Sequence, residues 1–275
     1  MNTLILGANG KTGRRVAERL TTRGVPVRRG TRAGAPPFDW ERPDTWAPVL
    51  AGVDAVYVSY FPDLAVPGAV DAIRELTGLA EKAGVRRLVL LSGRGEAEAQ
   101  VAEDVVRAGS VEWTVVRCAW FNQNFSESYL LDPLLAGDVV LPAGDVTEPF
   151  VDADDIADVA VAALTEPGHG GRTYEMTGPR LLTFADAVAE IAEATGRPLT
   201  YRRMDLDEYV TAATGDGLPS DVAELLGYLF GEVLDGRNAW VGDGVEQALG
   251  RPAKDFATFA RENRAVWLPA AQLAR

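Results

Sequence analysis

The chain has 275 residues, of which 47% are hydrophobic, and its 27 Lys and Arg against 40 Asp and Glu give a net charge of −13. Because an acidic surface repels phosphates, this charge disfavours nucleic acid as a partner. The single histidine and the single cysteine, Cys118, disfavour a zinc site and rule out a disulfide within the chain. We therefore expect a cytoplasmic protein with no metal, and no apolar run is long enough to predict a membrane partner.

The strongest motif occupies the first twenty residues. Residues 4–6 form an apolar run typical of a buried parallel strand, and apolar residues then recur at helical spacing. Between them, Gly7 permits a tight turn, Gly10 lets the backbone approach a pyrophosphate, and Gly13 lets the helix pack closely on the strand. The helix N-terminus offers N–H groups and a positive dipole end to phosphates. This order of strand, glycines and helix predicts a dinucleotide site.

A second strand is expected over residues 25–32, with Arg32 at its carboxyl end. At that end the dinucleotide fold usually places the residue that contacts the 2′ position of the ribose. An Asp or Glu there would hold the ribose 2′-OH of NAD, whereas an Arg accommodates the 2′-phosphate of NADP. We therefore expect NADP(H) as the preferred cofactor and NAD(H) as the alternative. Arg28 or Arg29 could play the same part, and Arg32 would then be a solvated loop cation.

Strands and helices alternate through the rest of the first half. Strands are expected over 38–40, 56–59, 87–93 and 113–117, and helices over 43–50, 70–83 and 97–108. This alternation predicts an α/β fold with a Rossmann-type doubly wound parallel sheet.

The second half is expected to build a small C-terminal α/β lobe over the cleft. It contains a helix capped by Asp154 or Asp155, a strand over 173–177, a helix from Thr183 to Gly196, a strand over 199–202 and a mostly helical remainder in which 221–234 is longest. The predicted division is a dinucleotide-binding core over 1–152 and a substrate lobe over 153–275. Segments of about 153–180 are expected to return to the core.

The usual proton donor of short-chain dehydrogenases is missing. That chemistry uses Tyr-x-x-x-Lys, in which the lysine lowers the pKa of the tyrosine. Lys11, Lys82 and Lys254 are the only lysines, and each has a glycine four residues before it. A reductase of this kind needs an acceptor that takes hydride without that acid. An iminium carbon, a quinone, or a conjugated azo bond or enone meets this condition, with the nicotinamide supplying the chemistry.

Several further segments carry a resemblance to a known family. They are 7–16, 38–40, 52–57, 111–126, 149–157, 177–179, 249–252 and 256–267. On these segments the chain resembles the NmrA-like, atypical short-chain dehydrogenases over essentially its whole length. It is most similar to their branch of clavine-type (ergot alkaloid) dehydrogenases and bacterial relatives. Those relatives include quinone and azo-compound reductases and tailoring enzymes of aromatic polyketide pathways.

The resemblance implies NADP(H) bound by the glycine loop and by residues at the carboxyl ends of the strands. The expected cofactor set is Gly7, Asn9, Gly10, Lys11, Thr12, Gly13, Arg32, Asp39, Trp40, Ser59, Tyr60, Phe61 and Ser92. It also implies a substrate cleft between the sheet and the lobe, and the expected substrate set is Trp120, Phe121, Asn124 and Phe150. Two departures concern the nicotinamide face: Cys118-Ala119 replaces the usual Pro-Gly or Pro-Thr, and Gln100 or Glu103 stands where many members carry a His.

The candidate catalytic residues are therefore Ser92, Gln100 and Glu103. Alternatively, Glu103 is a solvated helix residue without a catalytic role. Phe125 is expected in the core, and His169 is expected to be solvated in its loop. Asp152, Asp154 and Asp155 resemble a metal cluster, but helix capping and surface charge are the preferred interpretation. Cys118 is expected to be a small buried hydrophobe rather than a nucleophile.

These observations predict an NADPH-dependent oxidoreductase that transfers hydride to a conjugated aromatic small molecule. A quinone, an iminium or a polycyclic ketone is the expected acceptor, in natural-product tailoring. The alternatives are an NADP(H)-binding redox sensor without turnover, or an aromatic-polyketide tailoring hydroxylase or ketoreductase of the same family. The expected partner is the small-molecule substrate, and the sequence makes no prediction of oligomeric state.

Overall fold

The structure is a computed structural model that describes residues 1–215 and 217–268. The chain divides into two compact units. The first contains residues 1–118, 153–176 and 243–252, and the second contains 119–152, 177–242 and the chain from Ala253 onward. Residues 153–176 thus return to the first unit. The division differs from the predicted boundary at 152, because residues 119–152 belong to the second unit.

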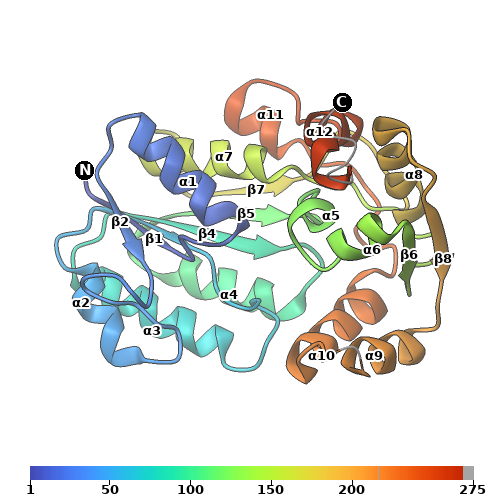
Figure 1. The fold of residues 1–275 in the computed structure, drawn as a ribbon. Coiled ribbons are helices and arrows are strands. Elements are labelled where there is room, and N and C mark those ends of the chain that lie inside the picture. Colours follow the sequence, from blue (N-terminus) through green and yellow to red (C-terminus); the bar gives the residue numbers. More distant parts are fainter. Residues whose placement is uncertain (216, 269–275) are drawn as a thin grey trace. The chain divides into compact units, whose positions relative to one another are not determined.

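The first unit is built on one parallel sheet. Its strands are β1(Thr3–Leu6), β2(Val27–Gly30), β3(Ala55–Val58), β4(Arg87–Gly93), β5(Glu112–Cys118) and β7(Arg172–Met176). Their order is β2-β1-β3-β4-β5-β7, and every neighbouring pair is parallel (Figure 1). The predicted Rossmann-type doubly wound fold is confirmed. The order reverses between β1 and β3, which is where folds of this kind bind their ligands.

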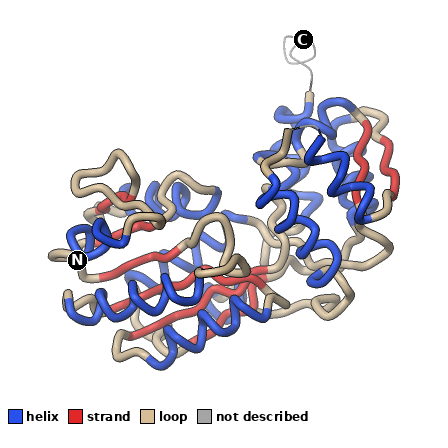
Figure 2. The backbone as a smooth tube through the Cα atoms, turned by 90° about the horizontal axis from the view of Figure 1, so that it is seen from below, coloured by secondary structure: helices blue, strands red, loops and turns tan. Residues whose placement is uncertain are grey.

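Helices cover both faces of this sheet (Figures 1 and 2). One face carries α1(Lys11–Thr22), α7(Ala153–Thr165) and α11(Gly244–Leu249), and the other carries η1(Pro43–Thr45), α2(Trp46–Leu50), α3(Ala69–Lys82) and α4(Ala97–Ala108). Alternate strand residues such as Leu88 and Leu90 enter the core beneath α3 and α4. This core fixes the carboxyl ends of the strands, where the site is expected.

The predicted strand over 38–40 is wrong. The Phe38 N–H donates to the carbonyl of Thr31 at 2.9 Å, but the Asp39 N–H donates to Thr45 Oγ1 at 3.1 Å. The segment therefore turns into η1 instead of pairing with the sheet. The second strand is also shorter than predicted, since β2 ends at Gly30.

The second unit combines a small parallel sheet with helices. The sheet pairs β6(Asp138–Leu141) with β8(Thr200–Arg203). Its helices are α5(Asn124–Glu127), α6(Leu131–Ala136), α8(Phe184–Thr195), α9(Leu206–Gly215), α10(Ser220–Tyr228), the π-helical η2(Leu229–Val233), α12(Phe256–Asn263) and the 3-10 turn η3(Arg264–Trp267). The predicted long helix over 221–234 is thus α10 continued by a π-helical turn.

Helix α8 begins and ends at the predicted residues. Thr183 Oγ1 accepts the N–H of Asp186 at 3.0 Å, and the Asp186 carboxylate accepts the N–H of Thr183 at 2.9 Å, which is a capping box. Gly196 ends the helix with φ +66°, a conformation that glycine adopts at no steric cost. Both boundaries follow from local chemistry.

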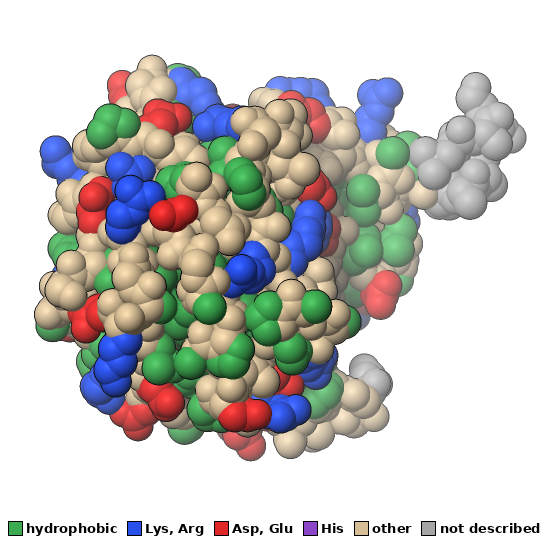
Figure 3. Space-filling view, turned by 90° about the vertical axis from the view of Figure 1, so that its left-hand side faces the viewer, with side chains coloured by type: hydrophobic (Ala, Val, Ile, Leu, Met, Phe, Trp, Pro, Cys, Tyr) green, Lys and Arg blue, Asp and Glu red, His purple; other side chains and the backbone are tan. Residues whose placement is uncertain are grey.

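Two surface properties complete the description. In the part of the chain that the structure describes, no helix is both long and apolar enough to cross a membrane. On the face shown in Figure 3, basic, acidic and hydrophobic side chains are interspersed. The acidic side chains are therefore not gathered into one patch on that face.

Candidate dinucleotide-binding site

The glycine loop joins β1 to α1 with the geometry that a pyrophosphate requires. Gly7 has φ +75°, and its carbonyl accepts the N–H of Gly10 at 2.9 Å. A Cβ on Gly13 would come within 2.2 Å of the Gly7 carbonyl oxygen, so only glycine allows this close packing. Gly10 is exposed and begins the helix without a side-chain cap, and Lys11 follows it. The first N–H groups of α1 are thus left for an anion.

The floor of this loop is formed by neighbouring residues of the sheet. The Tyr57 hydroxyl of β3 donates to Thr12 Oγ1 at 2.9 Å, and both side chains are buried. Burial raises the pKa of Tyr57, so this hydroxyl keeps its proton. Thr12 therefore points its side chain into the sheet and offers a ligand only its backbone. Ser59 lies against Gly7, since a Cβ on that glycine would be 3.0 Å from the Ser59 Cβ.

The arginines near β2 have different surroundings. Arg28 Nη1 donates to the carbonyls of Val49 and Ala51, each at 2.7 Å, and Arg29 Nη1 reaches the carbonyl of Ala8 at 3.4 Å. Arg32 is exposed and has no hydrogen bond or ion pair to any residue that the structure describes. Arg32 is therefore the cation of the three that is free to bind a phosphate.

An aromatic cluster borders the same edge of the sheet. The ring centroid of Trp40 lies 4.8 Å from that of Phe38 and 4.7 Å from that of Tyr60. The side chains of Trp40 and Tyr60 are both half-buried. Trp40 Nε1 is buried without a hydrogen-bond partner among the described residues. Phe61 is 75% exposed. The structure thus brings Trp40 and Tyr60 together, and leaves Phe61 available on the surface.

Two other predicted cofactor residues, Asp39 and Asn9, differ in their surroundings. The Asp39 carboxylate accepts the N–H of Glu41 at 3.2 Å, and the Asp39 carbonyl accepts the Trp46 indole N–H at 2.7 Å. Asn9 is exposed beside Gly10 in the glycine loop. Asp39 therefore shapes the aromatic cluster, and Asn9 lies at the mouth of the loop.

Ser92 and Glu103 form part of an enclosed ion-pair network. Ser92 Oγ donates to Glu103 Oε1 at 2.6 Å, and Arg117 Nε donates to the same oxygen at 2.8 Å. Arg107 Nη2 donates to Glu103 Oε2 at 2.7 Å, and Arg117 continues to Glu175 Oε1 at 2.6 Å. Glu103 has no exposed surface. It is neither a solvated helix residue nor placed to touch a substrate, and we correct both interpretations.

Gln100, one turn before Glu103 on α4, lies outside this network. Its side chain is exposed, whereas Ala99, Ala102, Glu103 and Val106 form the buried face of the helix. Gln100 and Glu103 are therefore not alternatives for one position. The catalytic role expected of Gln100 stays a prediction.

A carboxyl group that the sequence reasoning missed lies at the end of β4. A Cβ on Gly93 would come within 2.0 Å of Glu96 Oε1, so the Glu96 carboxyl rests directly on the last residue of the strand. Glu96 is 7% exposed, and its Oε2 has no hydrogen-bond partner among the described residues. The available signal was a glycine ending a central strand three residues before an acidic residue.

The predicted substrate residues all belong to the second unit, where their surroundings differ. Trp120 is half-buried against Phe184 and Phe230, with ring centroids 5.3 and 5.0 Å away. Phe121 and Asn124 are also half-buried. Phe150 is 2% exposed and packs in the aromatic core. The substrate role of Phe150 is therefore corrected to core packing.

Phe125 is a core residue, as predicted. It is 1% exposed, and its ring packs against Phe150, Phe184 and Phe256 with centroids 5.4, 5.9 and 5.2 Å away. These rings hold the segment after Trp120 in place.

The acidic residues at the start of α7 are bound by arginines. Asp154 Oδ1 accepts from Arg15 Nε at 3.1 Å and from Arg19 Nη2 at 2.9 Å. Asp155 is 1% exposed and accepts from Arg251 Nη1 at 2.7 Å. The surface-charge interpretation is therefore wrong for Asp155, which is a buried ion-pair partner. In the second unit, Asp152 lies 3.7 Å from Lys254 Nζ.

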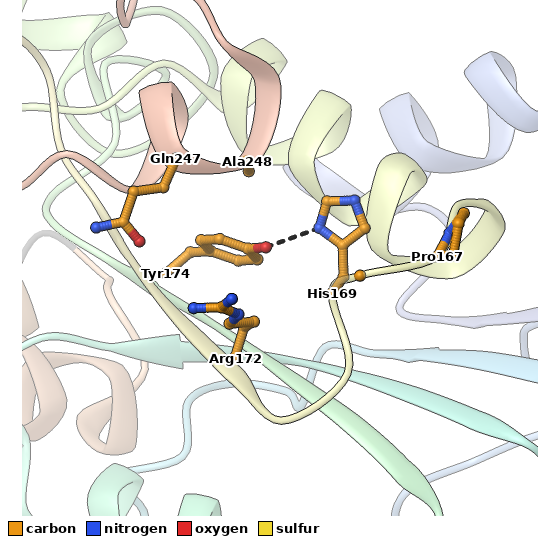
Figure 4. Close-up of a pocket in the computed structure, with 7 residues that line it drawn as sticks. Pro167, His169, Arg172, Tyr174, Gln247 and Ala248 are labelled. Atoms are coloured by element: carbon orange, nitrogen blue, oxygen red, sulfur yellow. Dashed lines mark hydrogen bonds between the residues drawn. The ribbon is translucent and has the colours of Figure 1, made fainter.

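A polar hollow of about 480 Å³ lies at the amino end of β7, opposite to the carboxyl ends of the strands. Figure 4 shows His169 beside Tyr174, joined by a 2.8 Å hydrogen bond, with Gln247 of α11 and Arg172 around them. His169 is 7% exposed, so the prediction of a solvated histidine is wrong. Desolvation lowers its pKa.

Comparison with known proteins agrees with this geometry. Residues 7–167 match the family described as NAD(P)H-binding. The chain is 34% identical to the NAD(P)H azoreductase of Xenophilus azovorans over 91% of this chain and 87% of the relative. It is 30% identical to the festuclavine dehydrogenase of Aspergillus fumigatus over 98% of this chain and 99% of the relative. Its fold matches the NADPH complex of an Escherichia coli quinone oxidoreductase with a TM-score of 0.80 and 20% identity, covering 94% and 99% of the chains.

The fold, the glycine cradle and these matches define the class as NAD(P)H-dependent oxidoreductases. The chain belongs to the NAD(P)H-binding family. The resemblance to clavine-type dehydrogenases is thereby confirmed, and the chain shares its fold with a solved NmrA structure.

Proposed function

We propose that this protein uses NADPH to reduce a conjugated, aromatic small molecule: a quinone, an iminium, an azo compound or a polycyclic ketone. The observation that carries the proposal is a complete glycine cradle in a chain that has no Tyr-x-x-x-Lys. An acceptor whose conjugation or positive charge favours hydride addition suits such a site. The azo compounds and clavines named for its relatives are substrates of this chemical kind.

The cofactor would be held mainly by backbone groups. Gly10 leaves room beside the N-terminus of α1, where N–H groups would bind the pyrophosphate, and Gly13 lets α1 pack closely on the turn at Gly7. Ser59 and Tyr60 follow β3 at the same edge and would contact the ribose side. When bound, dihydronicotinamide supplies the hydride.

Arg32 supports the choice of NADPH over NADH. Its guanidinium lies just beyond β2 and is bound to no described residue, whereas that of Arg28 is held by two carbonyls. A free guanidinium at this point of the fold pairs with a 2′-phosphate.

Trp120 and Phe121 are the residues we propose for the aromatic substrate. The Trp120 ring is held on Phe184 and Phe230 and keeps part of its surface exposed. A ring fixed in this way orients a planar ligand at little entropic cost. Asn124, half-buried four residues later, would hydrogen-bond the acceptor.

The test is NADPH oxidation by the purified protein with a panel of azo dyes, quinones, iminium salts and polycyclic ketones. We expect stereospecific transfer of deuterium from labelled NADPH to one or more of these acceptors. Tight NADPH binding without turnover of any acceptor would contradict the proposal and favour a sensor.

A further inference from the structure

The carboxyl end of β4 carries a buried acid that the ion-pair network does not use. In register, Leu90 of β4 pairs with Val58, the last residue of β3, so Gly93 extends three residues further along the same edge. The Glu96 carboxyl rests on Gly93 at this edge. The glycine loop follows β1 at this same edge of the sheet, and a dinucleotide in this fold lies along it.

The surroundings of Glu96 favour its neutral form. Asp63, which follows β3, acts on it with a negative charge, and Glu98 and Glu103 add negative charge from α4. Arg94 of the same loop is directed to Glu175, with its Nε 3.0 Å from Oε2, and the buried thiol of Cys118 is also near. Desolvation, followed by the charge of Asp63, raises the pKa of Glu96 well above its usual range. No cation neutralises Glu96 among the residues described.

We propose that Glu96, positioned by Gly93 and Asp63, donates the proton that completes reduction of acceptors whose product needs one. This inference rests on the proposed function and supplies the acid that the missing Tyr-x-x-x-Lys would have provided. Glu96 is 7% exposed, and its Oε2 has no hydrogen-bond partner among the described residues. This oxygen can therefore donate a hydrogen bond to an acceptor.

The chemistry balances for an azo or ketone acceptor. The acceptor gains two electrons and one hydrogen as hydride from the dihydronicotinamide, which is oxidised. The O–H bond of the Glu96 carboxyl breaks, and an N–H or O–H bond forms on the reduced acceptor. The resulting carboxylate regains its proton from water. An iminium acceptor becomes a neutral amine on hydride addition and needs no such proton.

The central experiment compares acceptors in the isosteric variant Glu96→Gln. We expect azo and ketone reduction to fall by about a hundredfold or more, as for loss of a general acid. Iminium reduction and NADPH affinity should change little. Glu75→Gln, an exposed carboxyl on α3, is the matched control and should leave all rates unchanged.

Gly93→Ala provides a second route to the same result. The new methyl group would displace the Glu96 carboxyl, which is the flexible end of a side chain, while the acid itself remains in the protein. We expect the same selective loss of azo and ketone reduction. Asp63→Asn should move the decline of rate with rising pH to lower pH, because the carboxylate of Glu96 then forms more easily.

Infrared difference spectroscopy of the cofactor-free protein gives a readout without turnover. At neutral pH the wild type should show a protonated carboxyl band that is absent in Glu96→Gln. Absence of this band in the wild type, or equal rate changes for iminium and azo acceptors in the variant, would overturn the inference. A wild type that reduces only iminium salts and quinones would also overturn it, while the proposed function stands. A wild type that reduces no acceptor would remove both.

Discussion

Ser92 and Arg117 face each other in register on β4 and β5, and both donate to Oε1 of Glu103, at 2.6 and 2.8 Å. The carboxylate therefore joins two central strands to α4 from a position with no exposed surface. Removing one partner of an ion pair buried in this way strongly destabilises the folded protein, because the other charge is left buried and unpaired. The network thus holds the part of β4 that ends at Gly93.

The first prediction concerns this contact. Ser92→Ala removes one donor to a buried charged group and should lower the free energy of unfolding by about 1.5–3 kcal/mol. NADPH affinity should be unchanged, because the hydroxyl is committed to Glu103. Urea unfolding and cofactor titration measure the two quantities. Ser110→Ala, at an exposed site, is the control, and equal stability of the two variants would contradict the prediction.

The second prediction separates two glycines of the cradle. Gly10→Val should abolish NADPH binding in a folded protein, because Gly10 is exposed and its side chain would occupy the space of the pyrophosphate. Gly13→Ala should instead destabilise the fold by about 1–3 kcal/mol, since its Cβ would overlap the Gly7 carbonyl. Thermal unfolding and fluorescence titration distinguish them. Unchanged NADPH affinity in folded Gly10→Val would refute the cofactor assignment.

The third prediction addresses cofactor choice. Arg32→Ala should weaken NADPH binding by about 1.5–3 kcal/mol, or roughly ten- to a hundredfold, and leave NADH binding nearly unchanged. Isothermal titration with both cofactors measures the difference. In Arg28→Ala the ratio of the two affinities should stay that of the wild type, because Arg28 binds the carbonyls of Val49 and Ala51. Equal losses for both cofactors in Arg32→Ala would make it a surface residue only.

The fourth prediction concerns the substrate. Trp120→Ala should raise KM and lower kcat together for an aromatic acceptor, because the ring both binds and orients it. Trp120→Phe, which keeps a ring against Phe184 and Phe230, should retain most of the activity. Phe150→Ala should act on stability instead, by about 3–5 kcal/mol. Unaltered steady-state kinetics in Trp120→Ala would exclude this ring from the substrate site.

The fifth prediction uses the single histidine. Burial lowers the pKa of His169 in the folded state, so the unfolded chain binds more protons as the pH falls through about 6.5. The stability of the folded protein should therefore decrease below this pH and level off below the folded pKa. NMR gives the titration directly, since one imidazole is present. A His169→Gln variant should show a flatter dependence, and a titration at or above the ordinary pKa would refute the prediction.

Much of the dinucleotide site was predictable because its determinants are local. The turn at Gly7 and the contact of Gly13 with the strand arise within a few residues, and the capping box at Thr183 does so too. The failures involve partners that are distant in sequence. Phe38 was expected in a strand, but Thr45 and Trp46 take the hydrogen-bonding groups of the next residue.

The charged residues show the same limit. Glu103 shares the apolar spacing of Ala99, Ala102 and Val106, so helical periodicity indicates burial as readily as exposure. Burial of its charge depends on Arg117, which reaches it from another strand. The environment of the Glu96 carboxyl similarly depends on Gly93 and Asp63. No spacing in the sequence predicts that these residues lie near it.

By itself, the sequence determined the alternating α/β order, the glycine cradle of the dinucleotide and the lack of Tyr-x-x-x-Lys, because hydrophobic periodicity and glycine conformation act over short distances. Only the tertiary structure decided which polar groups are enclosed and which are free. It paired Glu103 with arginines, left Arg32 without a described partner and placed the Glu96 carboxyl on Gly93. The physical reason is that the cost of burying a charge is set by neighbours from other strands and helices, which the fold alone brings together.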